Sequence, residues 1–253
     1  MRFASGRIAM NTYSHFERDF KRWTRGKVAI FTALITPTAW LIFVGLTMSA
    51  KFTGDYLNFI TPGILIMTML FSSLQGGMYM SFDKLLGYLN KFMAMPSGRE
   101  SILFGKVLFI SVRGLVQVSM VLAIAFIMGV NVKTGLLGLV AIYLILFLFG
   151  CMLSSFAITV AMLTPDYDTY SAINGLISMP MFFASTALMP FSSMPVWMRA
   201  IAGLNPVSYT IDGVRAMFMG NLVAGLFGIV EVTAMAAAMS VICIYAFRRA
   251  TIG

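Results

Sequence analysis

The chain has 253 residues, of which 59% are hydrophobic and 11% are charged, and its mean hydropathy is +0.89. Soluble domains have about 25% charged residues, so this composition excludes an ordinary soluble protein. The net charge of +9 comes from basic residues dispersed along the chain, which argues against a nucleic-acid-binding protein. The composition indicates an integral membrane protein whose basic residues contact anionic lipid headgroups.

The segment before the first long apolar run has the pattern of an amphipathic helix. A helix of this kind can lie in the membrane interface with its aromatic face in the lipid. A plain basic anchor that assists insertion is equally compatible with the sequence. The residues that recur at helical spacing, between basic residues, are Ile8, Thr12, Phe16, Phe20 and Trp23.

Six apolar runs are long enough to cross a membrane as helices, since a crossing needs about 20 apolar residues. The runs are continuous rather than alternating, which favours helices over a β-barrel. The sequence therefore predicts one all-α integral membrane domain over residues 1–253. The predicted spans are 28–50, 57–81, 102–129, 136–163, 170–189 and 222–247.

The Lys and Arg residues predict the orientation of these spans. Seven precede the first span, four lie in the second connection and two in the tail, against four on the opposite side. Because positive loops stay in the cytoplasm, both termini are predicted to be cytoplasmic in a multi-pass cell-membrane protein.

The segment from Phe82 to Glu100 is a charged stretch between the second and third spans. Its apolar residues, which include Phe82, Leu86 and Leu89, follow helical spacing, while Asp83, Lys84 and Lys91 fall on the other face. Pro96 ends the pattern, and Arg99 and Glu100 follow it. The sequence thus predicts a cytoplasmic amphipathic helix, which is either a connector resting on headgroups or a handle gripped by a partner protein through charge pairs.

Two short amphipathic segments precede the last span. Residues 194–204 and 207–219 are separated by Asn205-Pro206, and both are too short to span, so we expect them in the outer leaflet. Asp212 and Arg215 are three residues apart and near enough to pair. A local ion pair and a contact with substrate both fit this spacing.

Arg113 and Glu231 are ionisable residues inside predicted spans, where such residues are costly and often functional. Counted from opposite faces, both lie near the middle of the membrane. They are expected either to neutralise each other or to line a translocation route.

No nucleotide site, metal site or catalytic constellation is found in the sequence. The stretch from Gly98 to Val107 comes nearest to a P-loop, but it has six residues between its glycines and Val after its Lys. The single histidine excludes the HExxH motif of zinc enzymes and leaves no Ser, His and Asp triad in a common site. The chain is therefore expected to bind no cofactor and to draw its energy from elsewhere.

Two stretches resemble the type-2 ABC exporter permeases: FDKLLGYLNKFMAMPSGRESILFGK between spans two and three, and LNPVSYTIDGVRAMF before the last span. The resemblance implies six helices per subunit, paired with a second permease copy in a homodimer or heterodimer. It also implies two ATPase subunits that bind ATP and Mg. In that family the segment from Phe82 to Glu100 is a coupling helix seated in the ATPase, and the residues before the last span form re-entrant outer helices.

Three functions are compatible with these observations. The first is an ATP-driven exporter of a hydrophobic drug, lipid or natural product, and the second is the same machine acting on a lipid-linked polysaccharide or glycolipid. Tyr209, Asp212 and Arg215, with Asn205 and Pro206 before them, look more like the drug-resistance branch. The third is an ion-coupled secondary transporter, which the scarcity of acidic and His residues in the spans disfavours.

Overall fold

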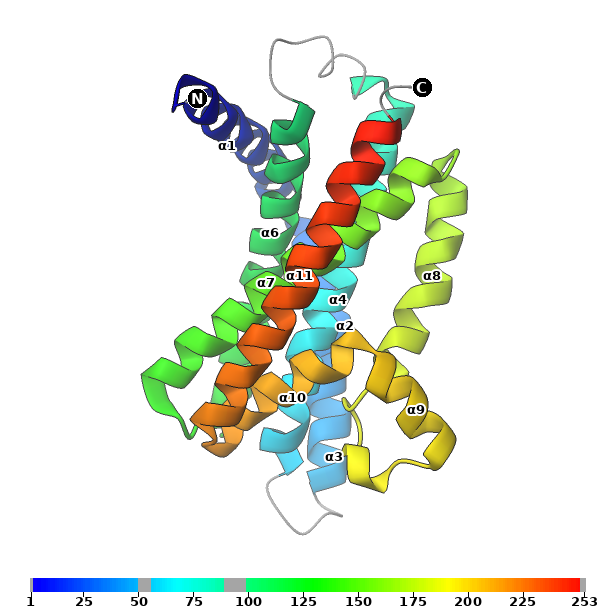
Figure 1. Ribbon diagram of the computed structural model, residues 1–253. Coiled ribbons are helices and arrows are strands. Elements are labelled where there is room, and N and C mark those ends of the chain that lie inside the picture. The colour runs from blue at the N-terminus through cyan, green and yellow to red at the C-terminus, as the bar shows by residue number, and fades with distance from the viewer. Residues whose placement is uncertain (1, 50–55, 89–98, 251–253) are drawn as a thin grey trace.

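The computed structural model describes residues 2–49, 56–88 and 99–250, and the regular secondary structure in these ranges is helical throughout (Figure 1). Long helices run side by side, and short helices gather at the end opposite the N-terminus. The elements that form the bundle or pack beside it are α1 (Arg2–Arg25), α2 (Lys27–Ala39), η1 (Trp40–Val44), α3 (Gly45–Ser49), α4 (Tyr56–Leu85), α6 (Arg99–Ile127), α7 (Gly135–Leu163), α8 (Tyr167–Phe183) and α11 (Leu222–Ala250). The short elements near the opposite end are η2 (Phe191–Ser193), α9 (Val196–Leu204) and α10 (Pro206–Met219).

Five of the predicted spans appear as helices long and apolar enough to cross a membrane. The first is built from α2, the π-helical turn η1 and α3, and the others are α4, α6, α7 and α11. Their bounds lie within a few residues of the predicted ones. The protein is therefore a multi-pass membrane protein, as its composition indicates.

The helix in the predicted fifth span, 170–189, ends earlier than expected, because α8 ends at Phe183 after 17 residues. At about 1.5 Å per residue this helix is roughly 25 Å long, less than the 30 Å of a typical hydrocarbon core. Its last carbonyl groups bond to side chains instead of to a further helical turn. The Asn205 amide donates to the carbonyl oxygens of Met181 (2.7 Å) and Ala184 (2.9 Å).

Helix α4 lies at the centre of the bundle and packs against α6, α7, α8 and α10. Four consecutive residues, Ile64 to Met67, are at most 1% exposed, so neighbours cover every side of the helix there. A helix that is apolar all round is expected at such a position. Movement of α4 must therefore displace several neighbours at once.

Helix α1 packs against α6, which corrects the prediction that its aromatic face lies in the lipid. Trp23 is buried, and Phe16 and Phe20 pack with it against a core cluster that includes Phe109. The helices touch closely at Gly105, where a Cβ atom would lie 2.8 Å from the Cβ atom of His15. The aromatic spacing is real, but it serves contact between helices.

Helices α10 and α11 approach each other at two glycines, Gly213 and Gly228. A Cβ atom on Gly228 would lie 2.7 Å from the Gly213 Cα atom, closer than real Cβ contacts allow. The backbones can pack at this distance only because neither residue has a side chain. The same use of small residues is common where membrane helices meet.

We expect Gly228→Ala to lower the free energy of unfolding by about 1–3 kcal/mol, because its methyl group must push α10 away from α11. Thermal unfolding of the purified chain in detergent measures the effect. Gly175→Ala in α8 is the matched control, since a Cβ atom there meets nothing within 4 Å. Equal melting temperatures for the two variants would contradict the close packing.

Candidate functional site

The second connection begins inside α4, which corrects the prediction that a separate helix starts at Phe82. Helix α4 runs without a break to Leu85 and turns at Gly87, whose φ of 68° is in the left-handed region that favours glycine. Of the other predicted coupling residues, Leu89, Lys91 and Pro96 lie outside the described residues. Arg99 and Glu100 fall in the first turn of α6.

Within residues 82–88, the part of this segment whose burial the structure describes, the predicted faces are reversed. Asp83, expected on the wet face, is 7% exposed, whereas Phe82, Leu85 and Leu86 are 41%, 67% and 53% exposed. Helical spacing alone cannot say which face of a short segment is buried. Here the answer depends on α6 and α1, which bring partner charges to Asp83.

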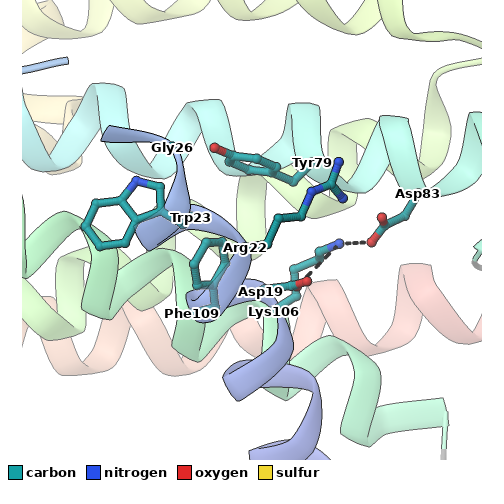
Figure 2. A pocket seen from close by; sticks show the side chains of 8 residues that line it. All are labelled: Asp19, Arg22, Trp23, Gly26, Tyr79, Asp83, Lys106 and Phe109. Carbon is teal, nitrogen blue, oxygen red and sulfur yellow. Dashed lines mark hydrogen bonds and ion pairs between the residues drawn. The ribbon is translucent and has the colours of Figure 1, made fainter. Parts of the chain in front are cut away.

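Asp83 belongs to an ionic cluster where α1, α4 and α6 meet, and Figure 2 shows three of its members, Asp19, Asp83 and Lys106. We call this cluster, together with Arg18, the junction. The Lys106 ammonium group bonds to the Asp83 carboxylate and lies 3.9 Å from an Asp19 carboxylate oxygen. Arg18 lies 2.6 Å from Asp19 and 3.7 Å from Asp83. Each carboxylate therefore faces two cations, which offsets the cost of removing the charges from water.

A small cavity of about 180 Å³ borders the junction, and Figure 2 shows Arg22, Trp23 and Tyr79 around it. The sequence interpretation missed Lys106 and Asp19 as site residues. Lys106 was counted with the second connection, although it lies within the bounds predicted for the third span, and a lysine there was a usable signal of a buried partner. Asp19 gave no such signal, because it lies among many charged residues of α1.

The end of α4 also contacts α7 and α8. The Lys84 ammonium group donates hydrogen bonds to the carbonyl oxygens of Thr164 (2.7 Å) and Met162 (3.4 Å), at the C-terminal end of α7. A cation at this end of a helix interacts favourably with the helix dipole. The Phe82 ring packs on Tyr167 of α8, with centroids 4.5 Å apart. One helical turn thus connects α4 to α1, α6, α7 and α8.

At the opposite end, Asn205 and Pro206 form the elbow between α9 and α10, as predicted. The Asn205 side-chain oxygen accepts a hydrogen bond from the Val207 amide and caps α10, while its amide group holds the end of α8. Pro206 occupies the first turn of α10, where its missing N–H costs nothing. The Tyr209 hydroxyl donates to the Gly203 carbonyl at 2.6 Å and ties α10 to α9.

Asp212 and Arg215 form the predicted local ion pair, 3.0 Å apart. The Thr186 hydroxyl donates to Asp212 at 2.8 Å, and the Arg215 guanidinium donates to the Thr186 carbonyl at 2.6 Å. Arg215 also donates to the Phe59 carbonyl and stacks over the Phe59 ring at 4.0 Å. These contacts join α10, the turn after α8 and the first turn of α4. We call the three residues that hold this end of the bundle together, Asn205, Asp212 and Arg215, the outer clamp.

Arg113 and Glu231 form no ion pair within the part of the chain that the structure describes, so that expectation is wrong. Arg113 is 3% exposed, donates to the Gln75 side-chain oxygen at 2.8 Å and lies over the Tyr79 ring. Glu231 is exposed on α11. Counting residues along two spans gives their depth, but it does not say which sides of the helices face each other. A role for either residue in a translocation route stays a prediction.

Among the described residues, no group of three or more His, Cys, Asp or Glu side chains could hold a metal ion. The polar groups at both ends bond to helix termini and to each other. The arrangement therefore suits the transmission of movement between helices, and its chemistry is that of hydrogen bonds and ion pairs.

Residues 11–219 match the family model described as ABC-2 type transporter. The chain belongs to this family. The match includes the junction and the outer clamp, so both belong to the part of the chain that the family shares.

The chain is similar to curated proteins from several organisms. The chain is 32% identical over 209 residues to the putative transport permease ycf38 of Cyanophora paradoxa, covering 80% of this chain and 72% of the relative. It is 22% identical over 213 residues to the daunorubicin resistance ABC transporter permease protein DrrB1 of Streptomyces coeruleorubidus, covering 83% and 75%. Nodulation protein J of Rhizobium leguminosarum is 21% identical, with 86% and 85% covered. These relatives and the family support a role as the permease of a transporter.

Replacing Lys106 tests the junction. We expect Lys106→Met to lower the free energy of unfolding by about 3–5 kcal/mol, because Asp83 keeps a buried charge without its closest cation. Chemical or thermal unfolding in detergent measures the loss. Glu17→Gln, which removes a more exposed pair with Lys21, should cost less than about 1 kcal/mol. The double variant Lys106→Met with Asp83→Leu should recover much of the loss, and a double variant no more stable than Lys106→Met would refute this account.

The packing of α1 on α6 should weaken in acid because of His15. Burial and the neighbouring Arg18 lower the pKa of His15 below its usual 6.5; Lys106 adds to this, whereas Asp19 and Asp83 oppose it. Since the folded chain binds the proton less readily than the unfolded chain, the contribution is complete above about pH 6.5 and is lost as the pH falls through the folded-state pKa. Trp23 fluorescence against pH reports this loss. In His15→Gln the same change should vanish, and an unchanged transition in that variant would exclude His15 as its source.

Proposed function

We propose that this chain is the permease subunit of an ATP-driven exporter that moves a hydrophobic drug, lipid or natural product out of the cytoplasm or the inner leaflet. Two separate ATPase subunits would bind ATP and Mg and supply the energy. The observation that supports this most directly is the end of α4, where exposed apolar side chains stand beside charged residues that are tied inward. We call this end of α4, from Phe82 to Tyr88, the tip. Its exposed apolar surface is suited to contact with a partner protein.

The exposed residues at this tip are Leu85, Leu86 and Tyr88, with part of Phe82. Exposed apolar residues gathered at one place are typical of protein contacts. Here the contact would use apolar side chains, whereas the charge pairs expected from the sequence are partly occupied: Asp83 holds Lys106, and Lys84 holds the end of α7. A partner that pushes on the tip would therefore move α4 together with α1, α6, α7 and α8.

We further propose that α8 makes a sixth crossing together with the turn from Ala184 to Pro190. The short helices α9 and α10 would then lie re-entrant in the outer leaflet, with both termini in the cytoplasm. The exposed face of α9 supports this placement, because Trp197, Ile201 and Leu204 are all exposed there and would be favourable in lipid. A second permease copy would complete the translocation route.

The hydrophobic class of cargo is supported by relatives named for resistance to daunorubicin and doxorubicin. In the described part of the chain, α4, α7 and α11 contribute few ionisable groups that could couple an ion gradient. These observations favour ATP-driven transport of apolar molecules over ion coupling. The direction of transport follows from the proposed likeness to these drug-resistance permeases.

The double variant Leu85→Ser with Leu86→Ser tests the tip, in a chain co-expressed with a candidate ABC ATPase subunit that co-purifies with the unaltered chain. We expect a several-fold loss of co-purified ATPase, because the contact loses its apolar area while the chain keeps its fold. Tyr13→Ser is the control, since Tyr13 is comparably exposed, at 60%, but lies on α1. Undiminished co-purification and undiminished transport-coupled ATP hydrolysis in the double variant would exclude the tip as the docking site.

A further inference from the structure

A second, larger cavity lies between α7, α8 and α11, away from the junction. Its volume is about 480 Å³, within the range of roughly 300–1,000 Å³ typical of small-molecule sites. The elbow between α9 and α10 closes one end of it through Leu204 and Pro206. The cavity is open on one side, so a molecule can enter it from the surroundings.

The cavity exists because α8 leans on α4 and has little contact with α7 and α11. In Figure 1, α8 stands apart from α11, with α9 and α10 below it. Asn205 fixes this separation, because its amide group binds the carbonyl oxygen of Met181, a residue of the cavity wall. The outer clamp and the cavity are therefore one piece of structure.

The lining determines what the cavity accepts. All ten lining residues have apolar side chains, so no lining side chain offers a strong hydrogen-bond donor or acceptor. Burying a hydroxyl, amide or charged group here would be unfavourable, because the group would lose its hydrogen bonds to water without gaining a partner. Four of the ten are methionines, whose flexible thioether side chains adapt to occupants of varied shape: Met152, Met181, Met235 and Met239.

We propose that this cavity binds one acyl chain of a membrane phospholipid-like amphiphile, and that molecules of this class are the cargo of the permease. The walls are formed largely by α7 and α11, two membrane-spanning helices, so bilayer acyl chains are the adjacent source of hydrocarbon. The polar headgroup stays outside, because nothing in the lining pairs with it. The assignment of cargo rests on the proposed exporter function, whereas occupation of the cavity does not.

Photolabelling tests occupation directly. The full chain is reconstituted without ATP in vesicles that contain phosphatidylcholine with a diazirine on its acyl chain, and labelled residues are located by mass spectrometry. We expect labelling at Met235 and Met239 to exceed labelling at Leu226 and Val230, which are exposed on the same helix. Labelling of the cavity no stronger than that of these two residues would overturn the proposal.

A matched pair of variants makes the test specific. Ala238 lines the cavity and Ala237 does not, although both are exposed on α11. Ala238→Trp should fill the space and reduce cavity labelling several-fold, while Ala237→Trp should leave it unchanged. Equal labelling in the two variants would contradict an acyl chain in this cavity.

Competition separates the classes of occupant. An excess of lysophosphatidylcholine should displace the label, whereas daunorubicin should not, because its polar ring substituents would be buried without partners. Displacement by daunorubicin alone would make the cavity a drug site and overturn the proposal. The double variant Leu85→Ser with Leu86→Ser should keep full labelling of the cavity while less ATPase co-purifies with it. A failure of the docking proposal is therefore distinguishable from a failure of this one.

Discussion

The bond between Asp83 and Lys106 is the interaction on which the arrangement of the junction depends. Both side chains are nearly inaccessible to solvent, and each comes from a different membrane-spanning helix. A buried charge without its partner is strongly unfavourable, so α4 and α6 cannot slide apart here without a large cost. Asp19 and Arg18 extend the same constraint to α1. The last turn of α4 is therefore held rigidly, although its exposed surface is apolar.

The opposite end of α4 is also held in place, by a hydrogen bond from an arginine to its backbone rather than by an ion pair between helices. Arg215 binds the Phe59 carbonyl near the start of α4, and Asp212 and Thr186 hold Arg215 in place. From Ile60 to Leu70, between these two ends, every residue of the helix is buried among its neighbours. A helix fixed at both ends and close-packed between them moves as a rigid rod, because dense interiors transmit displacement rather than absorb it. A push at Leu86 would thus reach the outer clamp and, through Asn205, the end of α8.

The sequence was sufficient for the features that depend on local patterns. Continuous apolar runs located five spans to within a few residues, and Asn205-Pro206 marked the elbow between two short helices. The errors concern contacts between residues far apart in the chain. Asp83 was assigned to water because its partner Lys106 is 23 residues away, and α8 was extended too far because the Asn205 that ends it is 24 residues beyond Met181. Arg113 likewise pairs with Gln75, which no spacing rule could select.

The reversal of faces at the end of α4 changes the physical basis expected for coupling. Charge pairs on an exposed helix would be screened by salt and worth little individually. An apolar tip gains from burial in proportion to its area, and this gain depends weakly on ionic strength. The charges are instead placed inside, where low dielectric makes them strong, and there they connect helices of the same chain. If the proposed docking holds, affinity for a partner and transmission of its movement would belong to different residues of one helical turn, Leu85 and Leu86 for the first and Asp83 and Lys84 for the second.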